Sequence, residues 1–218
     1  MKIIDLSLEI DNECMTCGTA WHEKVCIEQL GEMEKVGRNT TAIRLGSHTG
    51  THIDAPKHFS NQGYGVDKLD LNILCGNITV VDFTHIGKGE MVVLSDVEKL
   101  EVTERMLFRF NWHKWWKTEG YYREFPFFSL EAAKYLIDSG MKLIALDTPS
   151  PDDGKNISSR GEEDSPVHKH FLSKDVIIIE YLTNTDALDL DKKYCLAALP
   201  LKLKDVDGAP ARVVVMEE

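Results

Sequence analysis

Short apolar segments recur along the chain and predict β-strands. Each segment is continuously apolar or alternates apolar with polar residues, and each is rich in Ile, Val, Leu or Phe, which strands favour. They are Ile3–Leu8, Ile78–Phe83, Met106–Phe110, Leu143–Leu146, Val176–Ile179 and Ala211–Met216. The pattern therefore predicts strands from one end of the chain to the other.

Two helices are predicted between these strands. Ser95-Asp96-Val97-Glu98 has the form of a capping box, in which the Ser95 hydroxyl accepts from a free backbone N–H and Glu98 reaches back. The second helix has its N-cap at Ser129 and ends at Gly140, which tolerates the left-handed conformation of a helix end. The strand at Leu143–Leu146 follows at once, so we predict a mixed α/β fold.

Nothing in the sequence divides the chain into parts. It has no internal repeat, low-complexity tract or Pro/Ser-rich linker, and 218 residues fit one large domain. We therefore expect a single domain over residues 1–218. Residues 11–24 and 147–167 are long irregular segments, and long loops in compact domains are often functional.

The charge balance disfavours a nucleic-acid partner. Lys and Arg number 25 against 36 Asp and Glu, a formal net charge of −11 that would repel a phosphate backbone. The basic and aromatic segment Trp112–Lys117 is too short to reverse this. No apolar stretch reaches the ~18 residues of a membrane span, and Asp5 interrupts the start where a signal peptide would be apolar. We expect a soluble cytoplasmic protein without nucleic-acid or membrane partners.

The densest polar cluster is His48-Thr49-Gly50-Thr51-His52-Ile53-Asp54-Ala55-Pro56-Lys57-His58. Imidazole and carboxylate are ligands that a divalent metal such as Zn²⁺ prefers. In an extended chain, residues four apart lie ~13 Å from each other, too far for one metal. A turn at Gly50 would bring His48 and His52 together. The alternative is a set of histidines on a solvated loop, which the surrounding Gly and Pro residues disfavour.

The same cluster offers a candidate for proton transfer. A metal with three protein ligands keeps a position for water and lowers the pKa of that water towards ~7. A nearby titratable group that is not a ligand would then move the proton. His58 is the candidate, because an imidazole titrates near working pH.

A second polar cluster lies far along the chain. Glu180 closes a run of four β-branched residues, Val176–Ile179, where a buried carboxylate is costly unless it is paired or bound to a metal. A charge that reaches solvent from the strand end is the alternative. His168 and His170 would lie on alternating faces of an extended chain, so we expect only one of them to face the site. The local sequence does not choose between them.

These clusters together resemble the cyclase-like metal-dependent hydrolase family, which includes bacterial kynurenine formamidase and isatin hydrolase. The family motif His-x-Gly-Thr-His-x-Asp-x-Pro-x-His is unbroken from His48 to His58. Further similar segments are Leu146–Asp152, His168 with Glu180 twelve residues on, Leu199-Pro200-Leu201 and Asp207–Arg212. The resemblance runs from the first predicted strand nearly to the C-terminus.

The resemblance implies a role for each residue of the site. It implies a first metal bound by His48, His52 and Asp54, and a second metal to which Asp54 bridges. The ligands of this second metal would include His168, in preference to His170, and Glu180. His58 would be the general acid/base.

The resemblance also implies a fold and an assembly. The fold would be a single-domain swivelling β/β/α fold, and the protein would form homodimers or homotetramers. Two metal ions per chain are expected. The donor set of nitrogen and oxygen atoms suits Zn²⁺ and Mn²⁺ almost equally.

The sequence departs from the family at positions where the substrate would bind. Members often carry Pro-Gly and an aromatic substrate contact in the N-terminal loop, where this chain has Cys14–Trp21, and Trp21 is the candidate for the aromatic wall. Phe110-Asn111-Trp112 replaces a common Thr-Gly-Trp. Tyr181 replaces the Asn that often follows the metal-binding Glu. These changes concern the substrate more than the reaction.

Five cysteines remain without an assigned role: Cys14, Cys17, Cys26, Cys75 and Cys195. An odd number without a signal peptide indicates reduced thiols. Cys14 and Cys17 form one Cys-x2-Cys, but a structural zinc site normally needs a second pair of ligands nearby. We expect thiols without function, with a redox or metal role as the alternative.

Three functions follow from these observations. The first is hydrolysis of an amide, with N-formylkynurenine as the leading substrate because that is the best-defined activity of the family. The second is the opening of a cyclic amide or imide such as isatin by the same chemistry. The third, of another class, is a metal-binding or sensor protein without turnover, which would not need His58.

Overall fold

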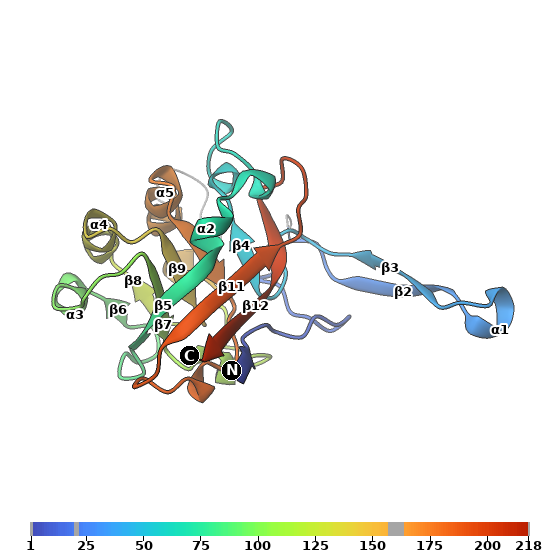
Figure 1. Cartoon of the computed structure of the whole chain (residues 1–218), viewed down its shortest axis with the longest axis horizontal. Coiled ribbons are helices and arrows are strands. Elements are labelled where there is room, and N and C mark those ends of the chain that lie inside the picture. Colours follow the sequence, from blue (N-terminus) through green and yellow to red (C-terminus); the bar gives the residue numbers. More distant parts are fainter. Residues whose placement is uncertain (1, 20–21, 157–163, 218) are drawn as a thin grey trace.

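The computed structural model describes residues 2–19, 22–156 and 164–217. Eight strands form its main sheet (Figure 1): β1 (Lys2–Asp5), β4 (His52–Asp54), β5 (Cys75–Asp82), β7 (Arg105–Arg109), β9 (Leu143–Leu146), β10 (Ile177–Glu180), β11 (Tyr194–Pro200) and β12 (Gly208–Glu217). Their order is β1-β12-β11-β5-β7-β9-β10-β4, and β4 also pairs with β12. The sheet therefore closes on itself like a barrel, with β4 between β10 and β12.

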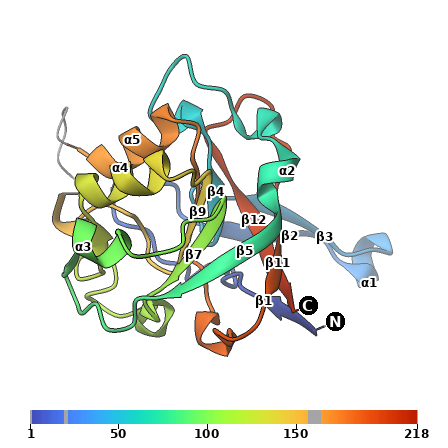
Figure 2. The same ribbon diagram turned by 60° about the vertical axis from the view of Figure 1, so that its left-hand side comes forward.

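Short helices cover this sheet. They are α2 (Leu71–Leu74), α3 (Leu94–Val97), α4 (Leu130–Asp138) and α5 (Pro166–Ser173), with 3₁₀ turns η1 (Pro56–His58), η2 (Val66–Lys68), η3 (Trp112–Trp115), η4 (Gly154–Asn156) and η5 (Thr185–Ala187). Helices α3, α4 and α5 gather on one side of the sheet (Figure 2). Beside them, β6 (Met91–Val92) pairs with β8 (Phe127–Phe128).

The central strands are apolar on both faces because each face packs against its own core. In β7, Met106 and Phe108 belong to the core under the helices, whereas Leu107 points into the core inside the barrel. Leu143–Leu146 and Ile177–Glu180 alternate in the same way up to Glu180. Strands buried on two sides read as continuous apolar runs, and this is why the sequence pattern found them.

The predicted strands are confirmed, with shifted ends except at Leu143–Leu146. The second predicted helix is also confirmed: the Ser129 hydroxyl accepts from the Ala132 N–H at 3.1 Å, and Gly140 has a φ of +103° just beyond the helix. The predicted capping box at Ser95 is wrong. The helix begins earlier because the carboxylate of Asp96 accepts from the N–H of Val93.

Helix α5 replaces the extended chain expected around His168 and His170. Pro166 begins it, a position where proline loses no hydrogen bond. Residues two apart on a helix also point to different sides, so the expectation that one histidine faces inward holds for another reason. His168 is buried, and His170 is partly exposed on the other side.

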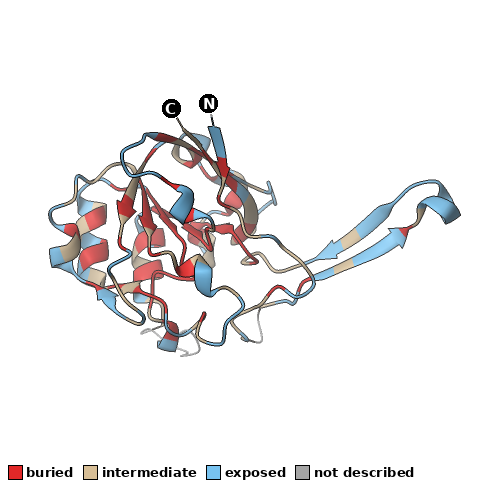
Figure 3. Cartoon of the chain, turned by 90° about the horizontal axis from the view of Figure 1, so that it is seen from below, coloured by how far each residue is buried: buried red, intermediate tan, exposed pale blue. Residues whose placement is uncertain are grey.

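An arm projects far from the body of the molecule (Figure 1). It consists of β2 (Cys26–Gly31), α1 (Met33–Val36) and β3 (Thr40–Arg44), and β2 pairs only with β3 among the described strands. Nearly all of it is exposed (Figure 3). Four large apolar side chains on the arm are more than half exposed: Leu30, Met33, Val36 and Ile43. The described helices include none that is long and apolar enough to cross a membrane.

Candidate metal centre

Strand pairing at β4 gathers three of the expected ligands on one face. His52 and Asp54 are two residues apart on β4, so their side chains point the same way. His52 lies directly opposite Glu180 on β10, and directly opposed residues of antiparallel strands share a face. All three side chains are buried. The carboxylate at the end of β10 therefore points into the protein and does not reach solvent.

A turn brings His48 to the same place, as the sequence predicted. Gly50 has a φ of +59°, a left-handed conformation that glycine adopts without strain. The Nδ1 atom of His48 lies 2.8 Å from Oδ1 of Asp54. Gly208, opposite Asp54 on β12, makes room for it, because a Cβ there would lie 2.7 Å from Cε1 of His48.

Asp152 orients His168 on α5. Its carboxylate accepts from the N–H groups of Val167 and His168 at 2.8 and 2.9 Å, and it lies 2.6 Å from Nδ1 of the His168 ring. Such a partner fixes which ring nitrogen is free to bind a metal. The free Nε2 of His168 lies 3.0 Å from Oε1 of Glu180 and 3.5 Å from Oδ2 of Asp54.

The backbone orients His52 in a similar way. Its Nδ1 donates to the carbonyl of Gly50 at 2.8 Å. Its Nε2 lies 3.2 Å from Oδ1 of Asp54 and 3.4 Å from Oε2 of Glu180. This is the arrangement of a metal-binding histidine, with one nitrogen held by the protein and the other directed at the site.

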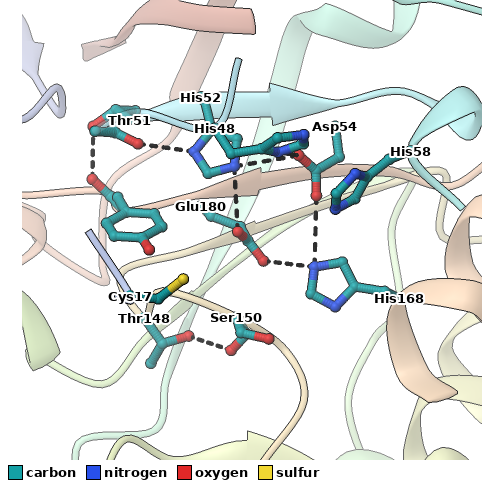
Figure 4. Close-up of polar contacts among 12 residues, drawn as sticks. Cys17, His48, Thr51, His52, Asp54, His58, Thr148, Ser150, His168 and Glu180 are labelled. Atoms are coloured by element: carbon teal, nitrogen blue, oxygen red, sulfur yellow. Dashed lines mark hydrogen bonds and ion pairs between the residues drawn. The ribbon is translucent and has the colours of Figure 1, made fainter. Parts of the chain in front are cut away.

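The residues present fit a divalent metal. Four buried atoms at the centre form ion pairs but no hydrogen bond of regular geometry among the described residues: Nε2 of His52, both carboxylate oxygens of Asp54 and Oε1 of Glu180. Buried polar atoms without regular hydrogen bonds are costly, and a cation bound between them would reduce that cost. Figure 4 shows their side chains converging with those of His48, His58 and His168.

The donor atoms form two groups that share Asp54. One group is His48, Asp54 and His58, the other is His52, Asp54 and Glu180, and within each group the atoms lie within 4.8 Å of one another. The sequence predicted that all six residues belong to one site, but it placed His58 outside the ligand set. In the structure, the donor atom of His58 lies within 4.8 Å of that of Asp54, close enough for both to bind one ion.

With no metal bound, the charged side chains of the cluster strongly shift one another's pKa. Burial alone would lower the pKa of His52, but the adjacent carboxylates of Asp54 and Glu180 outweigh it and raise that pKa to about 10. Burial would raise the pKa of Asp54, but His48 and the other imidazoles hold it well below its usual range. His52 therefore carries a proton at neutral pH when no metal is bound.

We expect metal binding to release protons, and affinity to rise with pH. Because the pKa of His52 is raised, a metal must displace its proton anywhere below about 10. The gain should be about tenfold per pH unit for each proton displaced. Calorimetric titration with Zn²⁺ from about pH 6 to about pH 9, in buffers of different ionisation enthalpy, measures both quantities. An affinity independent of pH would contradict this.

Asp152→Asn should weaken metal binding without removing a ligand. The amide keeps the shape but loses the charge that holds Nδ1 of His168, so we expect ~10–100-fold lower affinity. Competition against a chelator of known affinity measures the change. Asp153→Asn, on the neighbouring residue, is the control. An equal change in both variants would contradict the role of Asp152.

Asp207 is a member of the site that the sequence did not single out. Its Oδ2 lies 2.7 Å from Nε2 of His48 and 3.4 Å from Nδ1 of His58, whose rings are 3.9 Å apart. Hydrogen bonds with these two histidines hold the pKa of Asp207 well below its usual range. Burial and the neighbouring His48 lower the pKa of His58. Only its place in the Asp207–Arg212 segment could have signalled it.

Five of the six donor residues, all except Asp54, line a cavity of about 430 Å³ together with Asp207. Its other walls include Cys17, His22, Phe59 and Tyr181. Tyr181 has a φ of +58°, which costs a bulky residue roughly 1–2 kcal/mol, and its ring lies 5.4 Å from that of His52. Backbone strain of this kind is concentrated at functional sites. Trp21, the expected aromatic wall, lies outside the described residues.

Comparison with known proteins agrees with this geometry. The Cyclase family model, described as "Putative cyclase", matches residues 4–153. Kynurenine formamidase of Bacillus anthracis is 32% identical over 221 residues, covering 98% of this chain and 97% of that protein. Kynurenine formamidase of a Bacillus cereus strain is 33% identical, with 97% and 96% covered.

Solved structures show the same fold. Isatin hydrolase A from Labrenzia aggregata superposes with a TM-score of 0.85 at 21% identity, covering 99% of this chain and 93% of that one. A protein from Bacillus stearothermophilus described as a "predicted metal-dependent hydrolase" superposes with a TM-score of 0.78 at 28% identity, covering 98% of this chain and 97% of that one. The expected fold is confirmed. The chain belongs to the cyclase family and is a cyclase-like metal-dependent hydrolase.

Proposed function

We propose that this hydrolase cleaves an aryl formamide, converting N-formylkynurenine to kynurenine and formate. The observation that carries the proposal is the cluster of buried His52, Asp54, His168 and Glu180 with half-buried His48 and His58, beside a cavity large enough for a small aromatic amide. Relatives named kynurenine formamidase, similar over almost the whole chain, support the choice of substrate.

We further propose two divalent ions per chain, Zn²⁺ or Mn²⁺. The two donor groups that share Asp54 support this number, since one tetrahedral ion would leave part of the donor set unused. His168 would join the ion beside Glu180, because its free Nε2 faces that carboxylate. When bound, the ions would polarise the amide carbonyl and lower the pKa of a water ligand.

His58 is proposed to move the proton. It ends the 3₁₀ turn η1, lines the cavity and is held by Asp207. As water oxygen bonds to the carbonyl carbon and the C–N bond breaks, the leaving nitrogen must gain a proton. An imidazole on the cavity wall can take a proton from the attacking water and pass it to that nitrogen.

Turnover of a set of amides tests the substrate. The chain, loaded with Zn²⁺ or Mn²⁺, is incubated with N-formylkynurenine, formanilide and isatin, and products are followed by absorbance. We expect the fastest turnover with N-formylkynurenine. Faster opening of isatin would replace the formamide with the cyclic alternative. Full metal loading without turnover of any amide would support the binding or sensor protein.

We propose that the chain assembles as a homodimer or homotetramer through its arm. An isolated two-stranded hairpin is marginally stable in water, yet β2 and β3 extend from the body with Leu30, Met33 and Val36 exposed. A second copy would cover these side chains.

We also propose a cytoplasmic location, since five unpaired cysteines suit a reducing compartment.

The double variant Met33→Asp and Val36→Asp should weaken this assembly. Charges at the tip of the arm would oppose burial of apolar surface, and we expect self-association to weaken at least ~tenfold. Light scattering over a concentration series measures it. Glu34→Gln, on the same helix, is the control. An unchanged oligomer in the double variant would place the interface elsewhere.

A further inference from the structure

A strap contributes Cys17 and His22 to the cavity wall, two side chains that the metal centre does not use. We define it as residues 11–19 together with His22. It is fixed to the body at two points: Asp11 pairs with Lys117 at 3.1 Å, and the Tyr122 hydroxyl donates to the carbonyl of Met15 at 2.8 Å. The strap is therefore a built wall of the cavity.

Three polar side chains of the strap form a group of their own. The Nδ1 atom of His22 lies 2.9 Å from Sγ of Cys17 and contacts Oγ1 of Thr19, and Sγ and Oγ1 are 3.4 Å apart. A thiol and a hydroxyl each bring a proton to this cluster, whereas a thiol sulfur is a weak acceptor. If Nδ1 accepts from one of these groups, the ring proton is on Nε2, which lies 4.0 Å from Sγ of Cys17.

The surroundings of His22 disfavour its protonated form. Burial, reinforced by the nearby imidazoles of His48, His52 and His58, lowers its pKa to about 4. It belongs to neither donor group of the metal centre. Its ring centroid lies 6.4 Å from that of His48, edge on. A neutral N–H donor thus stands on the cavity wall, one ring away from the metal ligands.

We propose that His22 recognises the substrate through Nε2–H, by donating to an oxygen beyond the scissile amide. Cys17 is the positioning residue that holds the ring in this tautomer. The inference rests on the proposed amide hydrolysis and adds the residue that selects the substrate. Ketone and carboxylate oxygens are the class of acceptor that this donor fits.

The placement of the group favours a part of the substrate away from the reacting carbonyl. The carbonyl must lie beside Asp54 and Glu180, and His48 already stands between Asp54 and His22. Figure 4 shows the side chain of Cys17 beside that of Glu180, and both line the cavity. A substrate that spans the cavity would place its distal oxygens near His22.

Two substrates and two variants test the assignment. N-Formylkynurenine carries distal ketone and carboxylate oxygens, whereas formanilide has the same aryl formamide without them. We expect His22→Leu to raise KM for N-formylkynurenine at least ~tenfold, with a smaller change in kcat and a much smaller loss on formanilide. His22→Gln, which keeps a donor near the position of Nε2, should restore most of the affinity. Equal losses on both amides, or no loss on either, would overturn the proposal.

A second readout does not depend on turnover. In the metal-loaded chain with ¹⁵N-labelled histidine, we expect the His22 ring to be neutral with its proton on Nε2 at about pH 7.5. Cys17→Ala should give a mixture of tautomers, while Cys26→Ala on the exposed arm should not. A proton on Nδ1, or an imidazolium, would overturn the inference. A wild-type chain inactive on every amide would overturn only the proposed function. The tautomer, together with the change in the ¹⁵N signal of Nε2 when kynurenine is added, would then decide the role of His22.

Discussion

Asp54→Asn should remove most of the bound metal and lower turnover at least about a thousandfold, a loss of about 4 kcal/mol in transition-state stabilisation. Asp54 is shared by the two donor groups, and neither of its buried oxygens makes a hydrogen bond of regular geometry among the described residues. The amide has a similar shape, but its nitrogen repels a cation and its charge is gone. Elemental analysis and turnover on one preparation measure both effects.

The control for Asp54→Asn is Asp138→Asn. Asp138 is exposed on α4, so this substitution makes the same change of charge without touching the site. It should keep full metal content and activity. Full loading of two ions in Asp54→Asn would show that Asp54 bridges nothing. A ceiling of one ion per chain in the wild type would remove the second metal altogether.

His58→Ala should lower turnover ~10²–10⁴-fold, the usual contribution of a positioned proton shuttle and ~3–5 kcal/mol of barrier. We expect its metal content to stay near that of the wild type. His52→Ala should behave differently, because Nε2 of His52 faces both carboxylates and its loss removes a ligand. Metal and activity should then be lost together.

Metal stoichiometry separates the possible roles of His58. Because its ring nitrogen lies within 4.8 Å of the donor atoms of His48 and Asp54, His58 could also bind an ion. Loss of one ion per chain in His58→Ala would make it a ligand. Loss of thermal stability with both ions retained would make it a structural partner of Asp207. Near-wild-type turnover would rule out the proton shuttle.

The local parts of the site were predictable because short-range geometry controls them. Gly50 between His48 and His52 indicated a turn, and the apolar run before Glu180 indicated a buried strand end. Ring orientation was not predictable in this way. Asp207 contacts His48 across 159 positions of sequence, and only the pairing of β4 with β12 brings them together.

The errors have local causes too. The start of α3 depended on whether Ser95 or Asp96 supplied the capping oxygen, and both are suitable residue types. Helix α5 was missed because the segment with His168 and His170 was interpreted as extended, although Pro166 is a good first residue of a helix. The arm has no buried face, so no hydrophobic periodicity marks β2 and β3 beyond Ile27 and Ile43.

The strap and the arm are consecutive in the sequence, since β2 begins only four residues after His22. Both lie within residues 9–46, and that stretch contains none of the six donor residues and no strand of the main sheet. The fold thus keeps its chemistry and its outward contacts on separate stretches of chain. If the strap selects the substrate and the arm forms the interface, as proposed, a graft of residues 9–46 from a relative should transfer substrate preference and assembly together and leave the metal centre unchanged.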